Sequence, residues 1–338
     1  MNAPKKDHNI VSVSSGKDSD ATLLLAIERC ADNLQAVFAD TGNELPQVYE
    51  HLDYLEHKIG ITIRRVKGDF SADIARKREY VKNVWPAEGI SEAVIERALA
   101  VLHPTGNPYL DLCLWKGRFP SRKAQFCTEE LKRYPVLNQV LLPLINDPDT
   151  GDVYSWQGIR ADESAQRANY DELEEIGTGL FNYRPILKWT AQDVFDFHRK
   201  HGVKWNPLYE MGMSRVGCAP CINCRKEELH QLSARFPEEV ERVAEWERLV
   251  SQASKRQGAS FFGPGVMPVD IKGLTNAEAQ KKLAIHKVVE WSKTVRGGKI
   301  FDMMKLLPIP DGCSSSYGLC DIPAIDDGSV IMKCKVGN

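Results

Sequence analysis

The chain has 338 residues, and its 44 basic and 46 acidic side chains leave a formal charge close to neutral. This balance excludes a dedicated nucleic-acid coat protein or a polybasic membrane binder, although it allows a local basic patch. No apolar run approaches the roughly 20 residues of a membrane-spanning helix, and the first residues lack the apolar core of a signal peptide. We therefore expect a cytoplasmic protein without a membrane partner.

The first 70 residues alternate between strand-like and helix-like segments. The strand-like segments are short, apolar and rich in β-branched residues, as buried strands are. Alternating strands and helices predict an α/β fold with a doubly wound, mostly parallel, Rossmann-like sheet. Strands are expected at 9–14, 34–39 and 61–68, and helices at 19–31 and 46–59.

The middle of the chain is predicted less sharply. Residues 70–125 are polar, mostly helical in character and interrupted by prolines, so we expect a helical insertion or lid over the site. A helix is expected over 131–145, interrupted at a proline, and a further strand over 152–160. Thr190 with Asp193 three residues later has a weak capping-box form, which predicts a helix start.

Two domains are predicted from this organisation. Residues 1–235 are expected to form a nucleotide-binding domain that carries the insertion at 70–125. Residues 236–338 are expected to form a helical extension and a tail that contains Cys313, Cys320 and Cys334.

A short polar loop follows the first predicted strand and precedes the first predicted helix. Backbone N–H groups at such a helix start attract phosphate, and a glycine lets the backbone approach an anion closely. A lysine adds a mobile cation, and an aspartate can hold Mg²⁺ against phosphate oxygens. The alternative is an ordinary polar turn capped by a serine. The candidate phosphate ligands are Ser14, Ser15, Gly16, Lys17, Asp18 and Ser19.

Four segments together resemble the motifs of the phosphoadenylyl-sulfate (PAPS) reductase family. The loop 14–19 resembles the pyrophosphatase loop (PP-loop) of the adenine nucleotide alpha hydrolase-like superfamily. The other three segments appear in family order: Asp40-Thr41-Gly42-Asn43-Glu44-Leu45-Pro46, then Gly158–Ser164 with Arg167, then Asn206-Pro207-Leu208-Tyr209 with Gly212 and Gly217–Cys221. Their joint occurrence is far more specific than any one of them.

The resemblance implies an adenine nucleotide between the ends of the first two strands. Asp40 and Glu44 would then line the ribose or metal side, and Arg160 and Arg167 would face phosphate, sulfate or developing charge. Thr41, Gly42 and Glu163 complete the implied nucleotide site. Without the other motifs, these residues would be interpreted as turn residues and surface ion pairs.

Cys218, Cys221 and Cys224 are spaced so that one tight loop carries three thiols. Thiolates at such spacing suit an iron–sulfur cluster, here a [4Fe–4S] cluster; a structural zinc ion or merely buried thiols are the alternatives. The resemblance implies Cys127 as fourth ligand, because the family has a cysteine–lysine–proline segment there. In cluster-bearing members that segment has two adjacent cysteines, and Thr128 replaces the second.

Other cysteines leave this assignment open. Cys313 and Cys320 could form a separate pair or supply the fourth ligand. Cys30 and Cys113 lie among apolar residues, so we expect both to be buried.

Two departures from the reductases bear on function. The family's Glu-Cys-Gly-[Leu/Ile]-His segment near the C-terminus is absent, so Cys320 does not carry over as its nucleophile. Reductases often lose the lysine and aspartate of the loop, whereas Lys17 and Asp18 are present here, which fits members that cleave ATP between its α and β phosphates. The combination resembles the DNA-phosphorothioation member DndC and its phage-type relatives.

Three functions follow as hypotheses. The first is an ATP- and Mg²⁺-dependent enzyme that adenylylates an acceptor for sulfur insertion, with a nucleic-acid acceptor as one option. Its sulfur would come from a donor protein such as a cysteine desulfurase or a thioredoxin-like protein. The second is a reductase of PAPS or adenylyl sulfate (APS) that releases sulfite, and the third is a non-catalytic nucleotide- or cluster-binding subunit. The basic stretch 116–133, next to Cys127, is a candidate surface for an anionic acceptor or an ordinary solvated surface. No oligomeric state is predicted.

Overall fold

A six-stranded sheet forms the centre of the protein, for which the computed structural model describes residues 5–294. The strand order is β3-β2-β1-β4-β6-β5, and only β5 runs antiparallel to its neighbour. The predicted α/β fold with a mostly parallel sheet is therefore confirmed. The strands are β1 (Lys6–Val13), β2 (Leu34–Ala39), β3 (Ile63–Val66), β4 (Thr150–Trp156), β5 (Leu173–Gly177) and β6 (Leu180–Tyr183).

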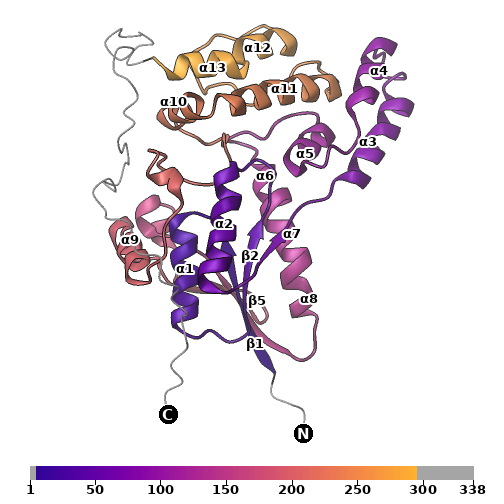
Figure 1. The fold of residues 1–338 in the computed structure, drawn as a ribbon. Coiled ribbons are helices and arrows are strands. Elements are labelled where there is room, and N and C mark those ends of the chain that lie inside the picture. Colours follow the sequence, from indigo (N-terminus) through magenta and orange to yellow (C-terminus); the bar gives the residue numbers. More distant parts are fainter. Residues whose placement is uncertain (1–4, 295–338) are drawn as a thin grey trace, which may run out of the picture.

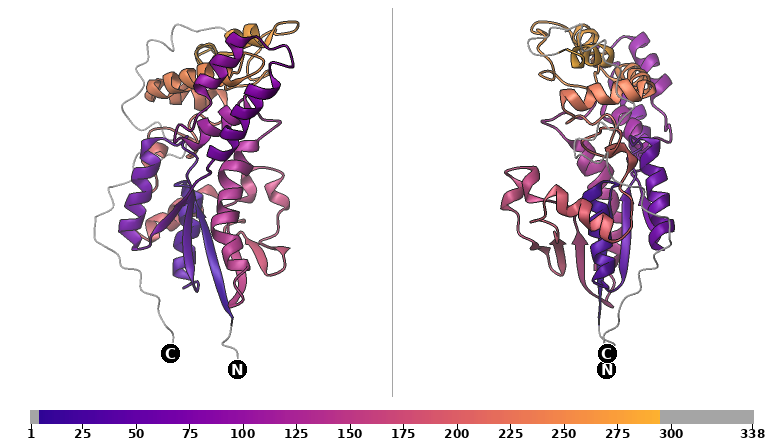
Figure 2. Two further views of the ribbon diagram at one scale, coloured as in Figure 1. Left: turned by 90° about the vertical axis from the view of Figure 1, so that its right-hand side faces the viewer. Right: turned by 60° about the vertical axis from the view of Figure 1, so that its left-hand side comes forward.

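Helices cover both faces of the sheet. Alternate side chains of a strand point to opposite faces of the sheet. In β1, Val11 packs against helices α1 (Lys17–Glu28) and α2 (Pro46–Ile59), and Ile10 packs against the helical stretch on the other face. Figures 1 and 2 show the sheet between these two helical layers. One layer contains α1 (Lys17–Glu28), α2 (Pro46–Ile59) and α9 (Ala191–Lys200).

The opposite layer is one long helical stretch from Phe126 to Ile145, longer than the predicted 131–145. Pro135 was expected to interrupt it, but the helix continues through this residue. Proline has no N–H and clashes with the preceding turn, and a widened π-helical turn lies just before each Xaa-Pro pair of this stretch. Its segments are α6 (Phe126–Thr128), a π turn (Glu129–Arg133), α7 (Tyr134–Val136), a π turn (Leu137–Leu141) and α8 (Leu142–Ile145).

A helical unit lies over the carboxyl edge of the sheet (Figure 1). The predicted insertion and the predicted extension contribute to one hydrophobic core, in which Trp85, Trp246 and Phe261 are buried. The domain boundary at residue 235 stays a prediction. The helices of the unit are α3 (Ser71–Val84), α4 (Glu92–Val101), α5 (Pro108–Lys116), α10 (Lys226–Arg235), α11 (Pro237–Ala253), α12 (Asn276–Leu283) and α13 (Ile285–Ser292).

One buried carboxylate ties parts of this unit together. Glu247 accepts hydrogen bonds from the backbone N–H of Phe261 at 2.8 Å and of Ile285 at 3.0 Å. Burial raises the pKa of Glu247 to about 7. The side chain thus connects α11 to the loop before α12 and to the start of α13.

Three smaller features complete the comparison with the sequence. The capping box at α9 is confirmed: Thr190 Oγ1 accepts from the Asp193 N–H at 3.1 Å, and Asp193 accepts from the Thr190 N–H at 2.8 Å. The hairpin of β5 and β6 was not predicted. Cys313 and Cys320, like Cys334, lie outside the described residues. Among residues 5–294, no helix has the length and apolar character needed to cross a membrane.

Candidate functional site

The loop 14–19 after β1, called the phosphate loop below, is held by its own hydroxyl groups. Ser15 is buried and has a φ of +62°, a left-handed conformation that costs energy for a non-glycine residue. The Asn206 amide donates to Ser15 Oγ at 2.7 Å and supports this turn. Ser19 Oγ accepts from the Ser14 N–H at 3.0 Å and donates to the Gly16 carbonyl at 2.8 Å, which closes the loop onto the first turn of α1.

Charged side chains form a chain at the mouth of this loop. Lys17 Nζ lies 2.6 Å from Asp18 Oδ2, and Arg160 Nε lies 2.5 Å from Asp18 Oδ1. Lys17 and Arg160 are nearly buried, at 3% and 4% exposure. Asp18 therefore has a cation on each carboxylate oxygen, and the structure brings together three of the four residues that were predicted to carry the chemistry.

Gly158 explains how the third motif approaches the loop so closely. A Cβ atom at this position would lie 2.7 Å from the Ser19 nitrogen and 2.8 Å from the Asp18 carbonyl carbon. Any side chain here would displace the backbone of the phosphate loop. The glycine thus lets the segment that carries Arg160 pack directly on it.

A second layer supports the loop from beneath. His198 Nε2 lies 2.9 Å from the Lys17 carbonyl oxygen, and the Tyr209 hydroxyl accepts from the Lys17 N–H at 3.1 Å. Asp20 Oδ2 lies 2.9 Å from His51 Nε2, and all of these side chains are buried. Tyr209 belongs to the fourth motif, but Asp20, His51 and His198 were missed, because no local pattern marks a contact between distant segments.

The second nucleotide loop, residues 40–44, is also held by hydrogen bonds between its own residues. Asp40 Oδ1 accepts from the Gly42 N–H at 3.0 Å and from the Tyr49 hydroxyl at 2.8 Å. Thr41 Oγ1 donates to Glu44 Oε1 at 2.6 Å. Burial raises the pKa of Glu44. The carboxyl group of Glu44 lies next to the thiol of Cys218, in the loop 217–224 that is called the cysteine loop below.

A cavity of about 520 Å³ lies between the carboxyl ends of the strands and the helical stretch 126–145. This is where ligands bind in doubly wound sheets. Ser14, Ser19 and Glu44 line it, as predicted for nucleotide ligands, and Lys132 lines it from the helical stretch. Phe38 and Leu137 add apolar surface of the kind that a purine base can contact.

Arg167 is not placed against the phosphate loop. It pairs with Glu163, four residues earlier, and its side chain is 39% exposed. Glu163 also accepts from the Arg160 N–H at 3.3 Å, so it orders the turn that carries Arg160. The phosphate-facing role of Arg167 stays a prediction.

Three of the four predicted metal ligands, Cys218, Cys221 and Cys224, line one small cavity, and the fourth, Cys127, interacts electrostatically with Cys221. Burial raises the pKa of Cys218 to about 11 and that of Cys224 to about 12. Burial, together with the neighbouring Cys221, also raises the pKa of Cys127. The charge of Cys218 is in turn the main cause of the raised pKa of Lys132, so thiols and lysine interact electrostatically.

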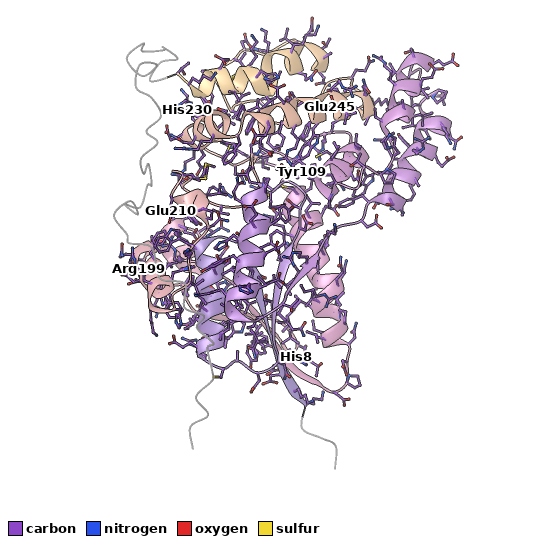
Figure 3. All side chains as sticks on the ribbon, in the orientation of Figure 1. His8, Tyr109, Arg199, Glu210, His230 and Glu245 are labelled. Carbon is purple, nitrogen blue, oxygen red and sulfur yellow. The ribbon has the colours of Figure 1, made fainter. Side chains whose placement is uncertain are left out.

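The kinds of side chain around these thiols suit a bound metal group, although the side chains of the described residues are not arranged around a metal position. Among residues 5–294, no three Cys, His, Asp or Glu side chains are arranged to hold a metal ion. However, the hydroxyl of Tyr109 is buried beside the thiols and finds no hydrogen-bond partner within the described part of the chain. Figure 3 shows Tyr109 at the junction of the helical unit and the sheet layer. A sulfur-rich group would supply an acceptor for this hydroxyl, so the residues present fit such a group.

The basic stretch 116–133 is partly engaged within the protein. Lys116 lies 3.1 Å from Glu130 and 3.6 Å from the centre of the Trp115 ring, and Arg122 donates to the Cys224 carbonyl at 3.1 Å. That this stretch binds an anionic acceptor substrate stays a prediction.

The two cysteines predicted to be buried, Cys30 and Cys113, differ from each other. Cys113 is fully buried, as expected. The prediction for Cys30 is wrong: α1 ends at Glu28, and Cys30 is exposed in the turn that follows.

The chain belongs to the phosphoadenosine phosphosulfate reductase domain family, whose model matches residues 8–96 and 119–224. It is 45% identical to an uncharacterised 37.8 kDa protein of Escherichia phage 186 over 326 residues, which cover 93% of this chain and 96% of the phage protein.

More distant relatives include named reductases. The chain is 24% identical to the phosphoadenosine 5'-phosphosulfate reductase of Vibrio atlanticus, over 62% of this chain and 64% of that enzyme. Among solved structures, the phosphoadenylyl-sulfate reductase of Candida auris aligns with 14% identity and a TM-score of 0.37, over 62% of this chain and 81% of that chain.

Proposed function

We propose that this protein cleaves ATP between its α and β phosphates to activate an acceptor for sulfur insertion. The observation that carries the proposal is the contact chain Lys17–Asp18–Arg160 at the mouth of the phosphate loop. A loop that only had to bind a sulfonucleotide would not need a carboxylate held between two cations. A carboxylate, a lysine and an arginine together suit Mg²⁺ and the charge of a departing pyrophosphate.

The proposed reaction begins with an exchange of partners at Asp18. A bound triphosphate would take Lys17, which now pairs with Asp18, as its counter-ion, and Asp18 would then be available to hold Mg²⁺, which would neutralise phosphate charge. Arg160 keeps the other oxygen, so the carboxylate stays in place. The adenine base occupies the cavity along Phe38 and Leu137.

The group transfer follows from this arrangement. An acceptor oxygen attacks the α phosphorus, the bond from that phosphorus to the bridging oxygen breaks, and pyrophosphate leaves with the electron pair. A sulfide-type nucleophile then displaces AMP from the acceptor. Lys17 and Arg160 stabilise the negative charge that develops on the phosphates.

We propose that Cys127, Cys218, Cys221 and Cys224 hold a [4Fe–4S] cluster next to this site, with zinc as the alternative. Such a group would supply a site where sulfur is held close to the activated acceptor. Three observations support the assignment: the three thiols that line one cavity, the hydroxyl of Tyr109, which has no partner among residues 5–294, and the N–H of Asn223 that donates to Cys221 Sγ at 3.4 Å. Iron and sulfide analysis after anaerobic purification distinguishes cluster from zinc.

The activity is tested by incubation of the protein with ATP, Mg²⁺ and candidate acceptors, including nucleic acid. Pyrophosphate and AMP should appear in equal amounts, and Lys17→Ala should abolish both. If neither product forms with any acceptor, the proposed cleavage is wrong.

A second candidate is the reduction of a sulfonucleotide to sulfite. It is favoured by the relatives that are named as phosphoadenosine and adenosine phosphosulfate reductases, of which this chain spans 64% and 56% of the length. Thioredoxin-dependent release of sulfite from PAPS or APS would establish it. Retained biological activity in Lys17→Ala and Asp18→Ala would instead favour a non-catalytic subunit.

A further inference from the structure

The second nucleotide loop and the cysteine loop are bonded to each other. The Ala219 N–H donates to the Asn43 carbonyl at 2.7 Å, and the Asn43 amide donates to the Pro220 carbonyl at 2.9 Å. Glu44 and Cys218 form an isolated antiparallel bridge beside these contacts. The two loops therefore form one hydrogen-bonded layer between the cavity and the thiols.

Arg242 of α11 clasps this layer from the helical unit. Its Nη2 donates to Asn43 Oδ1 at 2.9 Å and to the Ala219 carbonyl at 2.8 Å, and its Nη1 lies 3.4 Å from the Gly42 carbonyl. A guanidinium presents five N–H donors in a fixed plane, so it can serve both loops at once.

Neighbouring contacts fix the guanidinium in this place. Arg242 pairs with Glu239 one turn earlier on α11, and its Cζ lies 4.6 Å from the centre of the Trp246 ring. Trp246 stacks on Tyr109 with ring centres 5.4 Å apart, and the hydroxyl of Tyr109 is the one that lies beside the thiols. Helix α11 lies beyond the residues that match the family model, which end at 224.

We propose that Arg242 is a positioning residue through which the helical unit couples the nucleotide cavity to the cysteine loop. A ligand on the thiols orders the loop at Ala219, and Arg242 transmits that order to Gly42 and Asn43. The nucleotide then binds to a loop that is already ordered and binds more tightly. The inference rests on the proposed function, because it requires both a nucleotide and a thiol ligand.

The experiment measures the dissociation constant of a fluorescent, non-hydrolysable ATP analogue. The full-length protein is used either metal-free or loaded with Cd²⁺, a thiol-seeking probe ion. Wild-type protein should bind the analogue about fivefold or more tightly when it is loaded, and the analogue should strengthen Cd²⁺ binding by the same factor. In Arg242→Lys the factor should fall to about one, because an ammonium group cannot serve both loops.

The controls separate coupling from stability. Arg248→Lys alters the outer face of the same helix, where Arg248 pairs with Glu245, and should keep the wild-type factor. Arg242→Gln provides a second variant if Arg242→Lys does not fold. Failure of wild-type protein to bind the analogue overturns the proposed function together with the coupling. Binding that ignores Cd²⁺ overturns the coupling alone, and a factor that persists in a folded Arg242 variant overturns the role of Arg242.

Discussion

The proposed site has a phosphate side, built on the loop 14–19, and a thiol side, built on the cysteine loop, and the two sides differ in how completely they are built. On the phosphate side, Ser15, Lys17 and Asp18 each have partners within the protein. On the thiol side, the pKa of Cys218 is raised by burial and the hydroxyl of Tyr109 has no partner among residues 5–294. The difference teaches that the first site is preorganised by the chain itself, whereas the second is proposed to depend on its ligand.

The largest expected effect is on metal uptake by the thiol side. Each thiol must lose its proton before it binds a metal, and desolvation raises the pKa of Cys218 to about 11 and that of Cys224 to about 12. Below those values, these two thiols alone should strengthen Cd²⁺ binding about a hundredfold for each unit that the pH rises. Thiolate–Cd²⁺ absorbance between about pH 6.5 and 8.5 measures this. Cys218→Ser should flatten the dependence, and affinity that does not change with pH would contradict a buried thiol site.

The next effect concerns the phosphate side. Arg160→Ala leaves Asp18 without one of its two buried cationic partners and should reduce pyrophosphate release about a hundredfold, the usual scale for loss of a preorganised charge contact. Arg76→Ala, which removes an exposed pair with Asp73 on α3, is the matched control and should leave the rate unchanged. Equal rates for the two variants would show that the preorganised contact has no part in catalysis.

A single methyl group should test how closely the phosphate loop is packed. Gly158→Ala places a Cβ atom 2.7 Å from the Ser19 nitrogen, so the loop must shift at a cost of about 1–3 kcal/mol. Affinity for the fluorescent ATP analogue should fall about tenfold. Gly177→Ala on β5 has no atom within 4 Å of the added group and should bind normally. An unchanged affinity in Gly158→Ala would mean that the loop adapts freely.

The smallest expected effect is a change in the free energy of unfolding that should have opposite signs in metal-free and metal-loaded protein. In metal-free protein, Tyr109→Phe removes a buried hydroxyl that has no hydrogen-bond partner among residues 5–294 and should stabilise the fold by about 1 kcal/mol. In metal-loaded protein the hydroxyl should have an acceptor, so the same change should destabilise it. Chemical denaturation of both forms measures the two free energies of unfolding, with the exposed Tyr134→Phe as control. The same sign in both forms would argue against a ligand that contacts Tyr109.

Local patterns were sufficient to predict strands β1 to β4 and the two loops. The limits of β2 and α2 agree with the structure, because an apolar run and a proline at a helix start are signals within a few residues. The loop 14–19 and Arg160 were found through motifs, and the structure brings them together.

Contacts between distant segments were not predictable in the same way. His51 meets Asp20 across 31 positions, and nothing in the neighbourhood of either residue indicates the pair. Pro135 was expected to break a helix, because its accommodation depends on a widened turn that has no sequence signature. The joining of insertion and extension into one core likewise arises from packing and not from either segment alone.

The clasp at Arg242 also has a consequence for synthesis of the protein. Gly42 and Arg242 are 200 positions apart, so the nascent chain exposes its second nucleotide loop long before helix α11 is available to hold it. The sheet can begin to form as β1 to β3 emerge, since domains generally fold as units during synthesis from the N-terminal end. The nucleotide site, by contrast, acquires this support only after residue 242 has been synthesised. Fragments that stop before α11 should therefore fold around the sheet and still lack the order at residues 40–44 that the full chain provides.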